Sequence, residues 1–145
     1  MSDEPILTEE ARLAGFTNEG GTDGKICFLQ NITGLWILQK LMQEWKEEGK
    51  DVAYSTLLPA AEVAETDALI DVDDTVFQCP VSMAEAITNY CIAHQQTSPS
   101  TQGEFVKCVL RSLALRYKTG MEALNRLLPE PVTKLYVIGG GSQNK

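Results

Sequence analysis

The residues of this chain that could bind a ligand include a glycine-rich run near its C-terminal end. The run 139–144, with the sequence GGGSQN, would let the backbone approach a ligand closely and point N–H groups at it. It is not a P-loop, because no Gly-Lys-Ser/Thr follows, and it does not match the GxGxxG pattern. A plain C-terminal tail is the alternative interpretation of this run.

Two amide side chains, Asn31 and Gln39, lie at the start of an amphipathic stretch. Asn31 stands between the apolar run 26–30 and a helix expected from Gly34, a junction from which side chains often reach into a cleft. A turn-forming or helix-capping role is the alternative for Asn31, and a solvated surface position is the alternative for Gln39. These residues alone leave both interpretations open.

Carboxylates gather in two places. Glu19 and Asp23, within the glycine-rich segment 16–25, could bind a cation or act as acid and base, although a β-turn with solvated carboxylates has the same composition. The stretch 69–74 carries three aspartates but lacks the glycine and the final glutamate of a calcium-binding EF-hand loop. It is interpreted as part of an ordinary acidic loop over 69–80.

The elements that must position these residues are mostly helices. Hydrophobic spacing and capping patterns predict helices over about 8–13, 34–48, 53–64 (interrupted or restarted at Pro59), 82–95 and 101–128, and strands over 26–30 and 134–138. Two strands cannot cover a sheet of their own. The sequence therefore predicts a helix-rich α+β domain with an incomplete sheet, which is part of a larger protein. Within it we expect a lead-in over 1–15, a turn and strand over 16–30, a helical body over 34–128, and a strand with the glycine-rich loop over 134–145.

Composition narrows the function classes. The chain has 145 residues, 43% of them hydrophobic, and a formal net charge of −8. Such acidity argues against a nucleic-acid backbone binder and against a polybasic membrane patch, and no apolar run approaches the roughly 18–20 residues of a membrane-spanning helix. The four cysteines show no metal-ligand spacing, so a cytoplasmic protein with reduced thiols and no metal site of its own is expected.

In combination, four motifs resemble a known family. They are FTNEGGTDG, ICFLQNITGLWILQK, GEFVKCVLRSLALRY and LYVIGGGSQN, in this order along nearly the whole chain. Together they resemble the C-terminal half of carbohydrate kinases of the FGGY type, most closely those of the rhamnulokinase group. The resemblance implies a partial actin-like, ribonuclease-H-like ATPase domain whose parent enzyme uses Mg²⁺ and ATP to phosphorylate L-rhamnulose at its 1-hydroxyl.

The resemblance also implies roles for single residues. Asn31 would contact the sugar, Gln39 the nucleotide, and Gly140 and Asn144 the adenosine part of ATP. The base that activates the sugar hydroxyl and the phosphate-binding loops lie, in this family, before the segment that the chain matches. A fragment that does not turn over alone is therefore expected, and it would self-associate through faces that are normally covered.

The resemblance leaves alternatives. A kinase of the same family that acts on fuculose or xylulose is one, and a non-enzymatic acidic helical interaction module is another. The resemblance also implies that Cys91 and Cys108 lie on consecutive helices, close enough for a disulfide, although reduced thiols are favoured in a cytoplasmic protein.

Overall fold

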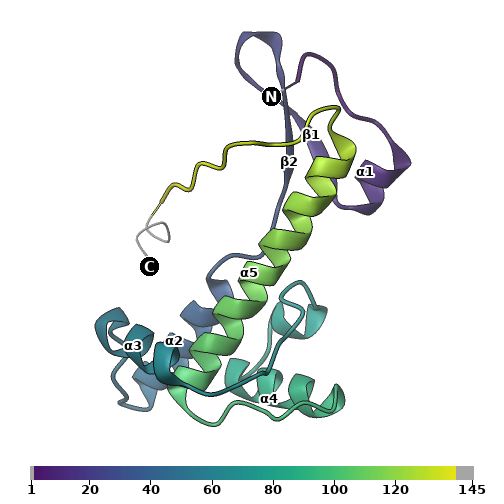
Figure 1. The fold of residues 1–145 in the computed structure, drawn as a ribbon. Helices are drawn as coiled ribbons and strands as arrows, with labels where there is room; N and C mark the ends of the chain where they lie inside the picture. The colour runs from purple at the N-terminus through teal and green to yellow at the C-terminus, as the bar shows by residue number, and fades with distance from the viewer. Residues whose placement is uncertain (1, 140–145) are drawn as a thin grey trace. The chain divides into compact units, whose positions relative to one another are not determined.

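The structure is a computed structural model that describes residues 2–139. The described residues fold into two compact units, one made of 2–30 with 119–139 and the other of 31–118. The long helix α5 (Gln102–Leu127) contributes residues to both units. Each unit is described by itself below (Figure 1).

The first unit is built on a β-hairpin. Strands β1 (Phe16–Gly20) and β2 (Ile26–Gln30) pair antiparallel, with Phe16 opposite Gln30, and the single-turn helix η1 (Thr22–Gly24) connects them. Asp23 and Gly24 adopt positive φ angles of 55° and 71° in this connection, which is the conformation that aspartate and glycine tolerate best.

The prediction of turn structure over the whole of 16–25 is wrong for β1. Asn18 and Gly20 have low intrinsic strand propensity, but the ladder formed with β2 outweighs that preference, since strand formation depends strongly on pairing and packing. Phe16 is buried and stacks on Phe28 with ring centroids 4.8 Å apart. The short helix α1 (Glu9–Leu13) completes this unit, with the Thr8 side chain capping its start as expected.

The second unit contains most of the core. Figure 1 shows helices α2 (Trp36–Glu47), α3 (Tyr54–Val63) and α4 (Met83–Ala93) gathered around the first part of α5, and the single turn η2 (Thr75–Phe77) precedes α4. The side chains that fill the space between these helices are buried almost completely, among them Ile37, Leu38, Leu41, Met83, Ile87, Val106 and Val109. A continuous apolar core therefore fixes α2, α4 and α5 within this unit.

Both predicted capping boxes begin helices. The Ser82 hydroxyl accepts a hydrogen bond from the backbone of Glu85, and Thr101 and Glu104 each accept from the other's backbone N–H. Helix α3, in contrast, runs without a break through Pro59, so the predicted interruption there is wrong. Pro59 is the sixth residue of α3, and the packing of Leu57 and Ala61 into the core outweighs the hydrogen bond that proline cannot donate.

The segment 134–138 is not a strand, contrary to the prediction. Within the described residues 2–139, the sheet consists of β1 and β2, and 134–138 pairs with neither of them. Its β-branched and aromatic composition fits a strand, but a strand forms only where a neighbour accepts and donates its backbone hydrogen bonds. Leu135, Tyr136, Val137 and Ile138 are consequently exposed.

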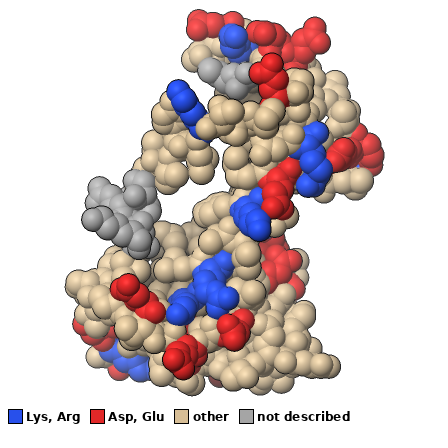
Figure 2. All heavy atoms as spheres, in the orientation of Figure 1, with Lys and Arg blue, Asp and Glu red and all other residues tan. Residues whose placement is uncertain are grey.

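Charged side chains of both signs lie at the surface. On the face drawn in Figure 2, basic groups lie beside acidic groups, and they do not gather into one field. Across the described part of the chain, none of the helices has the length and apolarity needed to cross a membrane.

Candidate functional site

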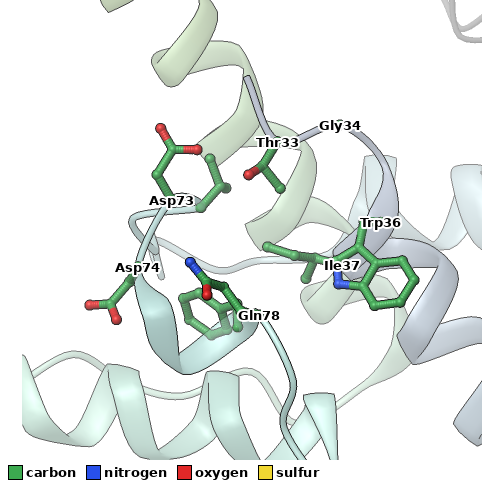
Figure 3. Close-up of a pocket in the computed structure, with 9 residues that line it drawn as sticks. Thr33, Gly34, Trp36, Ile37, Asp73, Asp74 and Gln78 are labelled. Carbon is green, nitrogen blue, oxygen red and sulfur yellow. The ribbon is translucent and has the colours of Figure 1, made fainter. Parts of the chain in front are cut away.

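A pocket of about 460 Å³ opens in the second unit, where the loop before α2 meets the acidic segment (Figure 3). Small-molecule sites commonly fall between roughly 300 and 1,000 Å³ and combine an apolar lining with a few polar groups. The lining has this mixed character and consists of Thr33, Gly34, Trp36, Ile37, Val72, Asp73, Asp74, Phe77 and Gln78. The pocket is therefore the candidate ligand-binding feature of this unit.

The acidic segment 69–80 is packed against the helices on one side, which the sequence did not predict. It is a loop for most of 69–80, as expected, but Ile70, Val72 and Phe77 are buried and hold it against the helices. Asp74 caps η2 by accepting a hydrogen bond from the backbone of Val76. The alternation of Ile70 and Val72 with aspartates was the available signal that one side of this segment is buried.

Asp73 is the most strongly engaged carboxylate of the pocket. Partial burial raises the pKa of Asp73, but the hydrogen bond and positive charge of Arg116, together with the side chain and backbone N–H of Thr33, outweigh burial and bring that pKa below its usual value. Arg116 donates from Nε to the Asp73 carboxylate. In Figure 3, Asp73 and Trp36 lie on opposite sides of the pocket, and Thr33 lies between them with its side-chain oxygen turned toward Asp73.

Asn31 and Gln39 lie on either side of the start of α2. Both side chains are exposed, and neither is among the residues that line the pocket. Asn31 precedes the pocket residue Thr33 by two positions, and Gln39 follows the pocket residue Trp36 by three, nearly one helical turn. The structure thus places both on one short stretch of backbone and leaves both accessible to a ligand.

The remaining predicted ligand and metal positions either do not line the pocket or lie outside the described residues. Gly140 and Asn144 lie outside the described residues. Glu19 and Asp23 are exposed on the hairpin of the first unit. Within the described part of the chain, no three His, Cys, Asp or Glu side chains come together in a way that could hold a metal ion.

Cys91 and Cys108 are on consecutive helices, α4 and α5, and both are buried as free thiols. Burial raises the pKa of Cys91, and burial together with the neighbouring Cys91 raises the pKa of Cys108 to about 12. Both groups are therefore held in the protonated, weakly nucleophilic form.

Comparison with known proteins identifies the family. The family model described as the C-terminal domain of the FGGY family of carbohydrate kinases matches residues 1–145. The chain is 41% identical to a rhamnulokinase of Bacteroides thetaiotaomicron over 144 residues, and this alignment covers 99% of the chain and 29% of that relative. It is 40% identical to a rhamnulokinase of Pectobacterium carotovorum over 145 residues, or 28% of that relative.

The rhamnulokinase of Oceanobacillus iheyensis is 36% identical over 141 residues, which cover 97% of the chain and 29% of that relative. The chain therefore spans less than a third of the length of these relatives. The match over the whole chain confirms the resemblance found in the four motifs, and the chain belongs to the FGGY family of carbohydrate kinases, whose C-terminal domain it represents.

Proposed function

We propose that this chain is a segment of an ATP-dependent rhamnulokinase. The reaction of the whole enzyme would transfer the γ-phosphoryl group of ATP to the 1-hydroxyl of L-rhamnulose and release L-rhamnulose 1-phosphate and ADP. The supporting observation is 41% identity to a rhamnulokinase across almost the whole chain. The aligned region covers 99% of the chain and so spans the stretch that carries the predicted ligand contacts.

The proposed roles fall on four residues. Asn31 contacts the sugar, while Gln39, Gly140 and Asn144 contact the nucleotide. The exposure of Asn31 and Gln39 supports this assignment, because a ligand can reach both without any rearrangement of the core. A glycine at 140 suits an adenosine site, because the nucleoside can lie against a backbone that has no Cβ.

The contribution of this chain to catalysis would be orientation of the two substrates. Phosphoryl transfer depends on positioning, on charge stabilisation at the phosphates and on a base for the attacking hydroxyl. We assign the base, the phosphate-binding loops and the Mg²⁺ ligands to the part of the enzyme that aligns outside this chain. The described residues offer no cluster for a metal ion, so no step is assigned to Mg²⁺ here. The chain alone is expected to consume no ATP.

A chimeric enzyme tests the proposal. The aligned 144 residues of the Bacteroides thetaiotaomicron rhamnulokinase are replaced by this chain, and ADP release is measured with L-rhamnulose, L-fuculose and D-xylulose. We expect kcat/KM to be highest with L-rhamnulose and to fall at least about tenfold in the variants Asn31→Ala and Gln39→Ala, each of which removes one oriented polar contact.

The control variant is Asp67→Ala, which removes a fully exposed carboxylate away from the α2 loop and should leave the rates unchanged. Higher activity with L-fuculose or D-xylulose would move the assignment to another kinase of the family. A folded chimera, verified by circular dichroism, that phosphorylates none of the three ketoses would contradict the enzymatic role and favour an interaction module.

A further inference from the structure

The loop before α2 carries Asn31, yet it has no local device that fixes it. Residues 31–34 form no helix or strand, and the residue at the N-cap of α2, Leu35, makes no side-chain capping bond. Helices α1 and α4 differ in this respect, because Thr8 and Ser82 cap them. The first N–H groups of a helix have no partners within the helix, so the start of α2 depends on groups from elsewhere for its position.

Asp73 contacts the loop that leads into this helix start. Its carboxylate lines the same pocket as Thr33, two residues after Asn31, and the side chain and backbone of Thr33 both favour the charged form of Asp73. Thr33 and Asp73 line the same pocket, and in Figure 3 the side-chain oxygen of Thr33 is turned toward Asp73. The Asp73 carboxylate thus lies beside the loop at Thr33.

Asp73 is itself on a rigidly held segment. Side chains from α4, from α5 and from the loop between them bind the backbone of 69–71. The Gln96 amide accepts from the N–H of Leu69 and donates to its carbonyl. The Ser112 hydroxyl accepts from the N–H of Ile70, and the Tyr90 hydroxyl accepts from the N–H of Asp71. Arg116 of α5 then holds the Asp73 carboxylate directly. A supporting group can fix a loop only if it is fixed in turn, and this segment meets that requirement.

We propose that Asp73 is a positioning residue that holds the 31–34 loop, and with it Asn31 and the start of the helix that bears Gln39, in the geometry that ligands require. The inference rests on the proposed function for the roles of Asn31 and Gln39. The anchoring of the loop by Asp73 does not depend on that function. A displacement of a ligand contact by about 1 Å can reduce a rate by roughly a hundredfold, so a lost anchor at Thr33 would affect substrate use at Asn31.

The first measurement concerns anchoring alone and uses the 145-residue chain. Hydrogen exchange at the Thr33 amide is compared among the wild-type chain, Asp73→Ala and Asp67→Ala by NMR. Asp67 is the matched control, because it is also an aspartate paired with an arginine of α5, Arg111, but it lies outside the α2 loop. We expect exchange to be about three- to tenfold faster in Asp73→Ala, because the loop loses its contact with the carboxylate, and unchanged in Asp67→Ala.

The second measurement concerns the functional consequence and uses the chimeric kinase. Asp73→Ala should raise KM for L-rhamnulose about tenfold while kcat changes less, and Asp67→Ala should change neither constant. Thr33→Ser keeps the hydroxyl and should retain wild-type KM, whereas Thr33→Val, of similar size, should raise it. If Thr33 contributed only to overall stability, Thr33→Ser and Thr33→Val would not differ in KM for L-rhamnulose.

The outcomes separate the two proposals. Unchanged exchange at Thr33 in Asp73→Ala would overturn the anchoring, and faster exchange with unaltered kinetic constants would overturn the positioning role. An inactive wild-type chimera would count against the proposed function, and the Thr33 amide would still decide whether Asp73 holds the loop.

Discussion

Among the glycines of the described residues, Gly103 has the least room for a side chain. A Cβ built on it would lie 2.5 Å from the carbonyl oxygen of Ala60, a backbone atom of α3 that cannot turn away. We expect Gly103→Ala to lower the free energy of unfolding by about 1–3 kcal/mol, because α3 and α5 must separate slightly. Urea unfolding followed by circular dichroism measures this.

The matched control for that substitution is Gly34→Ala in the same unit. A Cβ on Gly34 has no neighbour within 4 Å, so the free energy of unfolding should change little. Equal effects of the two substitutions would show that the close approach of α3 and α5 does not limit the size of residue 103.

Asp73 should also give the chain a pH-dependent stability. Its pKa in the folded protein lies below the usual value of 3.8, because Arg116 and Thr33 favour the charged form. A carboxyl with a lowered folded pKa stabilises the protein above its unfolded pKa and loses this contribution as the pH falls through the folded pKa.

We therefore expect wild type to be more stable than Asp73→Asn at pH 7, and the difference to shrink as the pH falls below about 4. Thermal unfolding at a series of pH values measures it, and Asp67→Asn controls for the loss of one charge. A difference that stays constant from about pH 7 to pH 3 would contradict a stabilising role of the ionised Asp73.

At the scale of elements, Glu44 joins α2 to the start of α4. Its carboxylate accepts hydrogen bonds from the Ser82 hydroxyl and from the backbone of Met83 and Ala84. These backbone N–H groups have no partners within α4, and a negative charge at a helix N-terminus is favourable. Glu44 and Ser82 thus cap α4 together, one from another helix and one locally.

Glu44→Ala should lower the free energy of unfolding by about 1–2 kcal/mol, since it leaves two half-buried donors without their acceptor. Glu47→Ala is the control on the same helix, because Glu47 is exposed and bonds only the Gln43 side chain among the contacts of the described residues. Glu47→Ala should change the free energy of unfolding by no more than about 0.5 kcal/mol. If Glu44→Ala and Glu47→Ala lower the free energy of unfolding equally in chemical denaturation, Glu44 does not stabilise the protein by capping α4.

The contact between α4 and α5 should protect two cysteines from modification. Cys91 and Cys108 are fully buried and have raised pKa values, whereas Cys79 is exposed. We expect iodoacetamide at about pH 8 to label Cys79 rapidly, and Cys91 and Cys108 only after unfolding, because the thiolate is the reacting species. Peptide mass spectrometry with and without prior reduction measures labelling, and it would also reveal a Cys91–Cys108 disulfide, which would contradict the free thiols.

At the scale of the whole molecule, the segment 134–138 exposes four consecutive apolar side chains that another chain could contact. Its exposed side chains have strand-forming character, and unpaired segments of this kind tend to pair with a second chain. We expect the chain to self-associate as its concentration rises, more strongly at high salt, because salt screens the repulsion between chains of net charge −8.

Light scattering coupled to size-exclusion chromatography measures this association. Tyr136→Asp and Ile138→Asp should weaken it, whereas Ile92→Asp, which changes another exposed isoleucine, on α4, should not. A monomer at all concentrations, or equal weakening by Ile92→Asp, would refute the role of 134–138.

Local interactions explain which predictions from the sequence were confirmed. The caps at Thr8, Ser82 and Thr101 join residues three positions apart, so their pattern is visible in the sequence. The apolar faces of α2, α4 and α5 follow from helical periodicity in the same way. Family membership was also accessible, because the four motifs stand in order along the sequence, and the family match over residues 1–145 confirmed it.

Interactions between distant parts of the chain explain the rest. Strand β1 exists because β2 pairs with it, and 134–138 is not a strand because no such partner is present among residues 2–139. The acidic loop lines a pocket because Ile70, Val72 and Phe77 pack against the helices, and Asp73 there meets an arginine 43 residues further along the chain. The sequence by itself determined the helices and the family, since both follow from short-range patterns. Only the tertiary structure decided the pocket and the place of Asp73 in it, since these depend on contacts that form when the helices pack.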